Sequence, residues 1–96
     1  MVHSLRLFVT KRDAQVERGV ADAFWHREVL PTREAFFEAV EAAYDLIELP
    51  WFPSRAWIEV ERHDLIETIE CDRPVDEPGM VALALWACVP NLELGA

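Results

Sequence analysis

The sequence has few of the residues that build common catalytic motifs. Its 96 residues include one lysine, Lys11, and three glycines, so it holds no glycine-rich phosphate loop. It also lacks the His-Glu-x-x-His and Cys-x-x-Cys patterns that often bind zinc. Ser4 and Ser54 are its only serines, and neither lies in a nucleophile elbow. We therefore expect a protein that is not an enzyme and that binds no metal or cofactor.

Long apolar runs are also absent. The longest extends from Met80 to Val89, about half of the ~20 residues that a membrane-spanning helix needs. The N-terminal residues lack the charged start and long apolar stretch of a signal peptide, so we expect a cytoplasmic protein. Cys71 and Cys88 both lie in apolar segments, where we expect reduced thiols rather than a disulfide.

Positive charge is scarce and unevenly distributed. Residues 1–33 carry six basic and four acidic side chains, whereas residues 34–96 carry three basic and fourteen acidic ones. The net charge of −9 is therefore concentrated in the second part of the chain. Such a field repels nucleic acid and attracts basic partners, and a direct nucleic-acid binder would carry a basic patch instead. The alternative interpretation is that the charge only maintains solubility.

The patterns of apolar residues predict a single α+β domain. Alternation over residues 5–10 predicts a strand, and residues 56–61 and 65–71 predict a hairpin with a turn at 62–64. A long amphipathic helix is expected over residues 33–48, with Thr32 as its N-cap. The expected fold is a small antiparallel sheet of about four strands with this helix packed on one face. No internal repeat is evident.

Two segments fit more than one structure. Residues 13–25 place Val16, Val20, Ala23 and Phe24 at helical spacing, which favours a second short helix, although a strand near 20–29 is the alternative. The apolar run 80–89 favours a strand buried on both faces, at the centre of the sheet. Periodicity alone does not separate such a strand from a buried helix.

The predicted helix carries a row of five acidic side chains at spacings of four and three residues, which places them on one side of a helix. They are Glu34, Glu38, Glu41, Asp45 and Glu48. Like charges at these spacings cost ~0.2–0.5 kcal/mol per pair, and no basic residue lies between Glu34 and Pro53 to compensate. The row is either an ordinary solvated face or a surface that meets basic groups.

The leading functional hypothesis is a small acidic protein-binding module. It would inhibit or sequester a basic, nucleic-acid-handling protein by mimicking a nucleic acid, in the manner of phage counter-defence or antitoxin and immunity proteins. Trp51 and Phe52, held between two prolines, would act as aromatic anchors beside the row. The hairpin acids Glu59, Glu61, Glu67 and Glu70 extend this surface if they share its side. The alternatives are an assembly subunit with an apolar oligomer interface, such as a homodimer, and a small ligand-binding domain or enzyme.

Overall fold

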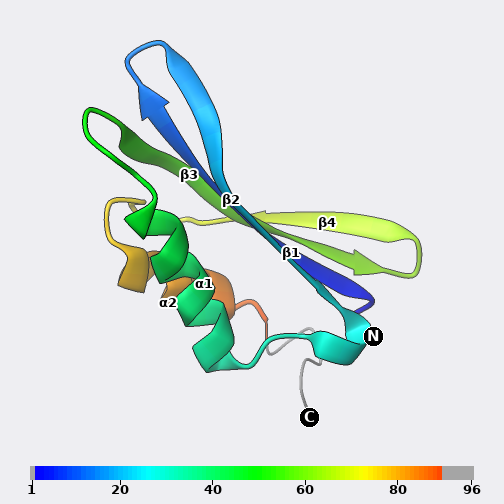
Figure 1. Ribbon diagram of the computed structural model, residues 1–96. Helices are drawn as coiled ribbons and strands as arrows, with labels where there is room; N and C mark the ends of the chain where they lie inside the picture. The colour runs from blue at the N-terminus through cyan, green and yellow to red at the C-terminus, as the bar shows by residue number, and fades with distance from the viewer. Residues whose placement is uncertain (1, 90–96) are drawn as a thin grey trace.

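The computed structural model describes residues 2–89 and has the α+β fold class that the sequence predicts (Figure 1). It contains a four-stranded antiparallel sheet and two helices with a short 3₁₀ turn. In chain order the elements are β1 (Ser4–Asp13), β2 (Val16–His26), η1 (Arg27–Val29), α1 (Arg33–Asp45), β3 (Phe52–Arg62), β4 (Leu65–Glu70) and α2 (Pro78–Trp86).

The sheet has the order β2-β1-β3-β4, with both helices on one side of it (Figure 1). Leu5, Leu7 and Val9 of β1 point to that side and are fully buried, because side chains alternate between the two faces of a strand. The intervening residues of β1 point to the opposite side, which no described helix covers. We call these two sides the helix face and the open face.

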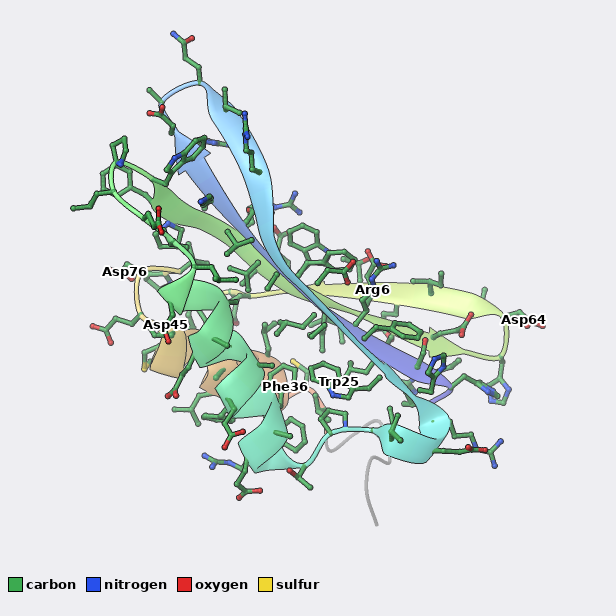
Figure 2. All side chains as sticks on the ribbon, viewed as in Figure 1. Arg6, Trp25, Phe36, Asp45, Asp64 and Asp76 are labelled. Atoms are coloured by element: carbon green, nitrogen blue, oxygen red, sulfur yellow. The ribbon has the colours of Figure 1, made fainter. Side chains whose placement is uncertain are left out.

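The core lies between the helix face and the helices. Phe36 and Val40 of α1 and Leu85 of α2 are fully buried against the strands. Phe36 is 6.0 Å from Trp25 of β2 and 5.4 Å from Trp86 of α2 between ring centroids, and Figure 2 shows Trp25 and Phe36 close together in this layer. The long helix expected over 33–48 is shorter than predicted: two short helices of 13 and 9 residues share this face.

The second predicted helix, over residues 13–25, is wrong. These residues form most of β2, which pairs with β1 along its whole length. The strand alternative was the better one, because Ala21, Ala23 and Trp25 point inward toward the core. Val20 is an extra residue, since Val9 pairs with Ala21 and Thr10 with Gly19. This bulge shifts the alternation and produces the helix-like spacing in the sequence.

The predicted central strand at Met80–Val89 is also wrong. Residues Pro78–Trp86 form α2, which buries Val81, Ala82 and Leu85 and leaves Met80 and Leu83 about half exposed. The sheet still has four strands because β2 supplies the fourth, at an edge of the sheet and not at its centre. The predicted turn at 62–64 is confirmed, since His63 and Asp64 have φ angles of 46° and 66°, as the type I′ turn of a two-residue hairpin requires.

The chain order β1-β2-α1 is repeated as β3-β4-α2, which the sequence did not reveal. Phe8 and Trp57 pair at the centre of the sheet, and Arg6 and Arg55 each precede them by two residues. Asp22 pairs with Phe8 on one edge strand, as Glu70 pairs with Trp57 on the other. These six side chains therefore follow a pseudo-twofold arrangement centred between Phe8 and Trp57.

Tyr44, the only tyrosine, joins α1 to the segment before α2. Its hydroxyl donates to the Val75 carbonyl at 2.6 Å, and burial, followed by the charges of Cys71 and Asp76, raises its pKa to about 12. A phenol absorbance titration should therefore have its midpoint near pH 12 in the native protein, against the ordinary value of about 10 in denaturant. Because the folded state favours the protonated phenol, Tyr44 contributes to the free energy of unfolding. This contribution is complete below pH ~10 and is lost as the pH rises toward 12. A native midpoint near pH 10 would contradict the described contact.

Candidate protein-binding surface

The acidic row lies on the solvent side of α1. Glu34, Glu38, Glu41 and Asp45 are exposed, and the opposite side of the helix buries Phe36, Val40 and Ala43. The helix begins where predicted, since the Thr32 hydroxyl oxygen accepts a hydrogen bond from the Ala35 amide at 3.1 Å. The four carboxylates extend over about 17 Å of helix. Figure 2 shows Asp45 near the far end of α1, beyond the buried Phe36.

Glu48, the fifth predicted member, lies outside α1. The helix ends at Asp45, with Leu46 as its C-cap residue, and Glu48 is exposed in the loop that leads to β3. The Glu48 carbonyl instead accepts a hydrogen bond from the Trp51 amide at 2.9 Å. Four carboxylates therefore follow the helical spacing, and the fifth is placed by the loop.

The basic side chains near α1 do not neutralise the row. Among residues 2–89, the described ion pairs join Arg6 to Asp22, Arg12 to Glu17, Arg55 to Glu70, Arg62 to Glu67 and Arg73 to Asp72. None of them includes a member of the row. Arg33, its nearest arginine in sequence, lies over the Phe37 ring at 4.2 Å from the centroid. Asp45 also lies at the C-terminal end of α1, where the last turn has no basic residue and the helix dipole disfavours negative charge.

The two predicted aromatic anchors differ in their surroundings. The Trp51 ring is half-buried and contacts two cations of the β1–β2 hairpin, Lys11 at 5.3 Å and Arg18 at 5.7 Å from its centroid. Phe52 is 63% exposed at the start of β3, and Leu49 in the preceding loop is 87% exposed. The exposed apolar groups that follow α1 in the chain are therefore Leu46, which is 58% exposed, Leu49 and Phe52, whereas Trp51 packs against the hairpin.

The hairpin acids do not extend the row. Glu59 and Glu61 of β3 pair with Arg6 and Ser4 of β1, and Glu70 of β4 pairs with Trp57, so these three carboxylates lie on the open face. Glu67 pairs with Val60, which points to the helix face, and forms an ion pair with Arg62. The sheet therefore separates Glu59, Glu61 and Glu70 from the carboxylates of α1.

The open face carries a second arrangement, which sequence reasoning missed. The rings of Phe8 and Trp57 are stacked, with centroids 4.9 Å apart and planes 11° from parallel. Arg6 lies over Phe8 at 4.9 Å and Arg55 lies over Trp57 at 4.4 Å. Because the inner ring faces lie against each other, the two guanidinium groups take the outer faces.

Each of these arginines also binds a carboxylate on an edge strand. Arg6 Nε donates to Asp22 Oδ1 at 2.6 Å, and Arg55 Nε donates to Glu70 Oε1 at 2.6 Å. These hydrogen bonds hold the pKa of Asp22 and of Glu70 below their ordinary values, so both pairs weaken only as the pH falls through the acidic range. The open-face column, defined as Asp22, Arg6, Phe8, Trp57, Arg55 and Glu70, thus crosses all four strands.

Within the open-face column, the aromatic ring faces on which a nucleic-acid base could stack are already in contact with other side chains. Single-strand binding sites combine exposed aromatic faces with a basic groove. Here the ring faces contact each other and the two arginines, and each arginine is already paired. The recurrence of Arg-x-aromatic at Arg6–Phe8 and Arg55–Trp57 was the sequence signal for this arrangement.

The described residues show no cluster typical of a metal site. Cys71 and Cys88 are free thiols, as predicted, and both are half-buried. Within residues 2–89, no three His, Cys, Asp or Glu side chains converge as metal ligands would. None of the described helices has the length and apolar character needed to cross a lipid bilayer.

Comparison of the chain with protein-family models, with curated proteins and with solved structures returned no match.

Proposed function

We propose that this protein binds a basic, nucleic-acid-handling protein partner through the acidic row of α1 and thereby inhibits or sequesters it. The observation that carries this proposal is the exposure of four carboxylates on one side of a helix, with every described ion pair elsewhere. Neighbouring carboxylates at this spacing lie about 5–6 Å apart. Such a ladder of negative charge is suited to a groove that otherwise holds a phosphate backbone, as in phage counter-defence or antitoxin and immunity proteins.

The apolar groups beside the row give this surface a second element. Leu49 lies in the loop after α1 and Phe52 at the start of β3, and both are among the most exposed apolar side chains described. Protein interfaces commonly combine an apolar anchor with a charged rim, the anchor supplying affinity and the charges supplying orientation and association rate. The proposed contact surface therefore comprises the α1 carboxylates with Leu49 and Phe52.

The test is capture of the partner from a lysate of the native host. Wild-type protein should recover a basic protein that the Glu38→Lys/Asp45→Lys variant does not, because the variant places positive charge where the partner is positive. The matched control is Glu28→Lys/Asp72→Lys, which changes the net charge equally at exposed sites away from α1. Equal recovery of the same partner by wild type and by the α1 variant would contradict the proposal.

A second candidate function is that of an assembly subunit, favoured by the composition of α2. Residues 78–89 carry no charged side chain, and Met80 and Leu83 are 43% and 50% exposed. Two copies that meet there would bring no charged side chain of residues 78–89 into the contact. Sedimentation should then show a homodimer that persists from low to high salt, since apolar contacts are not screened. A monomer at both salt concentrations would remove this candidate.

A further inference from the structure

The open face contains a hollow beside the column, between β2 and β4. Its volume is about 180 Å³, and its lining residues are Ser4, Arg6, Phe24, Glu59, Glu61 and Ile66. The apolar sides are provided by Phe24 and Ile66, which are 48% and 65% exposed. Glu59 and Glu61 come from the central strand β3, so the carboxylates lie between the two apolar side chains.

The charge of this hollow is negative. Arg6 is its only cation, and that guanidinium is bound to Asp22. Asp22, Glu59 and Glu61 together outweigh Arg6, whose pKa is raised by Asp22 and to a smaller extent by Glu59. Glu61 Oε1 accepts a hydrogen bond from the buried Ser4 hydroxyl at 3.3 Å, and Glu59 Oε2 accepts one from Trp57 Nε1 at 3.5 Å. Among the described residues, neither Glu59 nor Glu61 has a cation of its own.

A group that fits these surroundings has an aliphatic stem and a cationic end. Phe24 and Ile66 can contact the stem, and Glu59 and Glu61 can accept hydrogen bonds from the end. A guanidinium matches two neighbouring carboxylates better than an ammonium does, because its donors form a planar fork. An anionic ligand is excluded by charge, and a stacking base finds the ring faces of Phe8 and Trp57 already covered.

We infer that the open face is a second binding surface, which takes an arginine side chain from a peptide segment of a basic protein partner, with apolar residues of that segment lying against Phe24 and Ile66. This surface lies across the sheet from α1 and does not depend on the acidic row. A partner that binds both surfaces would have to reach two sides of the molecule, so the two sites can be tested independently.

The test uses the peptide acetyl-Leu-Arg-Leu-amide, with acetyl-Leu-Glu-Leu-amide as the charge-reversed control, in an NMR titration of the labelled protein. The arginine peptide should produce saturable shifts at the amides of Phe24, Glu59 and Ile66 and at the Trp57 indole N–H, with a Kd of about 1 mM, as expected for one side chain with few contacts. The glutamate peptide should produce no saturable shift. Shifts that grow linearly, that occur equally with both peptides or that centre on α1 would overturn the inference.

Variants separate this site from the rest of the surface. Glu59→Gln/Glu61→Gln keeps the side-chain shape and should weaken peptide binding about tenfold, the effect of ~1.4 kcal/mol. Ile66→Ser should weaken it as well, whereas Leu65→Ser, at the neighbouring and more exposed position on the other side of β4, should not. Unchanged binding in both open-face variants would contradict the inference.

The α1 variant distinguishes failure of this inference from failure of the proposed function. Glu38→Lys/Asp45→Lys should bind the arginine peptide as wild type does, since ions at 0.15 M screen charges beyond about 8 Å. If the α1 variant loses the natural partner and the wild-type protein does not bind the arginine peptide, the α1 proposal stands and the open-face inference is wrong. If the wild-type protein binds the peptide and the α1 variant recovers the partner as well as wild type does, the open-face inference stands and the α1 proposal is wrong.

Discussion

Replacement of Trp57 with alanine should lower the free energy of unfolding by about 2–3 kcal/mol, although the ring lies on the open face of the sheet. Loss of the stacked pair with Phe8 should cost about 1 kcal/mol beyond its buried area. Loss of the contact with Arg55 should cost roughly 0.5–1 kcal/mol at a partly exposed site, and the remaining loss comes from the buried part of the ring. Urea denaturation followed by circular dichroism measures the change by linear extrapolation.

Two further variants make this prediction specific to the open-face column. Trp57→Phe preserves a stacked ring and should lose less than about 1 kcal/mol, because the aromatic pair is retained. Phe52→Ala removes an aromatic ring that is 63% exposed on the same strand and should change stability by less than about 0.5 kcal/mol. A loss at Trp57 no larger than that at Phe52 would show that the column does not stabilise the sheet.

This prediction follows from the position of the open-face column, which packs side chains on the face of the sheet opposite the two helices. A two-layer α+β fold leaves one face of its sheet in water. Here that face carries large rings and two arginines rather than small polar groups, and each arginine also reaches a carboxylate on an edge strand. The outer strands β2 and β4 are thereby tied to the central pair by side chains as well as by backbone hydrogen bonds. The pseudo-twofold arrangement distributes these ties equally between the two halves.

The parts of the fold that were predicted correctly depend on local signals. Thr32 and the following helix formers identified the start of α1, and the turn at His63 and Asp64 separated the two predicted strands of the hairpin. Alternation in residues 5–10 identified β1, because its inward residues face a core and its outward residues do not. In each case the pattern within about ten residues was enough to favour one structure.

The two wrong assignments have different physical causes. In β2 the bulge at Val20 shifts the alternation by one residue, so that the spacing resembles a helix, and pairing with β1 determines the strand. In α2 every residue is apolar or small, so periodicity carries no information. Pro78 at the first helical turn was the available signal, since proline is favoured there.

The candidate sites also differ in how far the sequence predicts them. The carboxylate row could be placed from sequence because four of its five members lie on one helix, and only Glu48 lies beyond the helix end. The column and the hollow depend on the register between β1, β3 and their neighbours, which joins residues far apart in the chain. The separation of Glu59, Glu61 and Glu70 from α1 likewise follows from that register and not from composition.

Changing alternate members of the row to lysine should stabilise the protein while it removes partner binding. In Glu38→Lys/Asp45→Lys the three neighbouring pairs within α1 change from like to opposite charge, for a gain of about 1–2 kcal/mol in the free energy of unfolding. Lysine at position 45 also suits the negative end of the helix dipole, which adds a few tenths of a kcal/mol at an exposed site. A surface that lowers stability in this way is consistent with a role in binding.

The most direct measurement is therefore urea denaturation of Glu38→Lys/Asp45→Lys beside wild type and the charge-matched Glu28→Lys/Asp72→Lys protein, at low salt and again at high salt. The α1 variant should be more stable than both, with a difference that shrinks as salt screens the helix charges. If the α1 variant is instead less stable than wild type, the carboxylates are already neutralised within the chain. The exposed, uncompensated row on which the proposed function rests would then not exist.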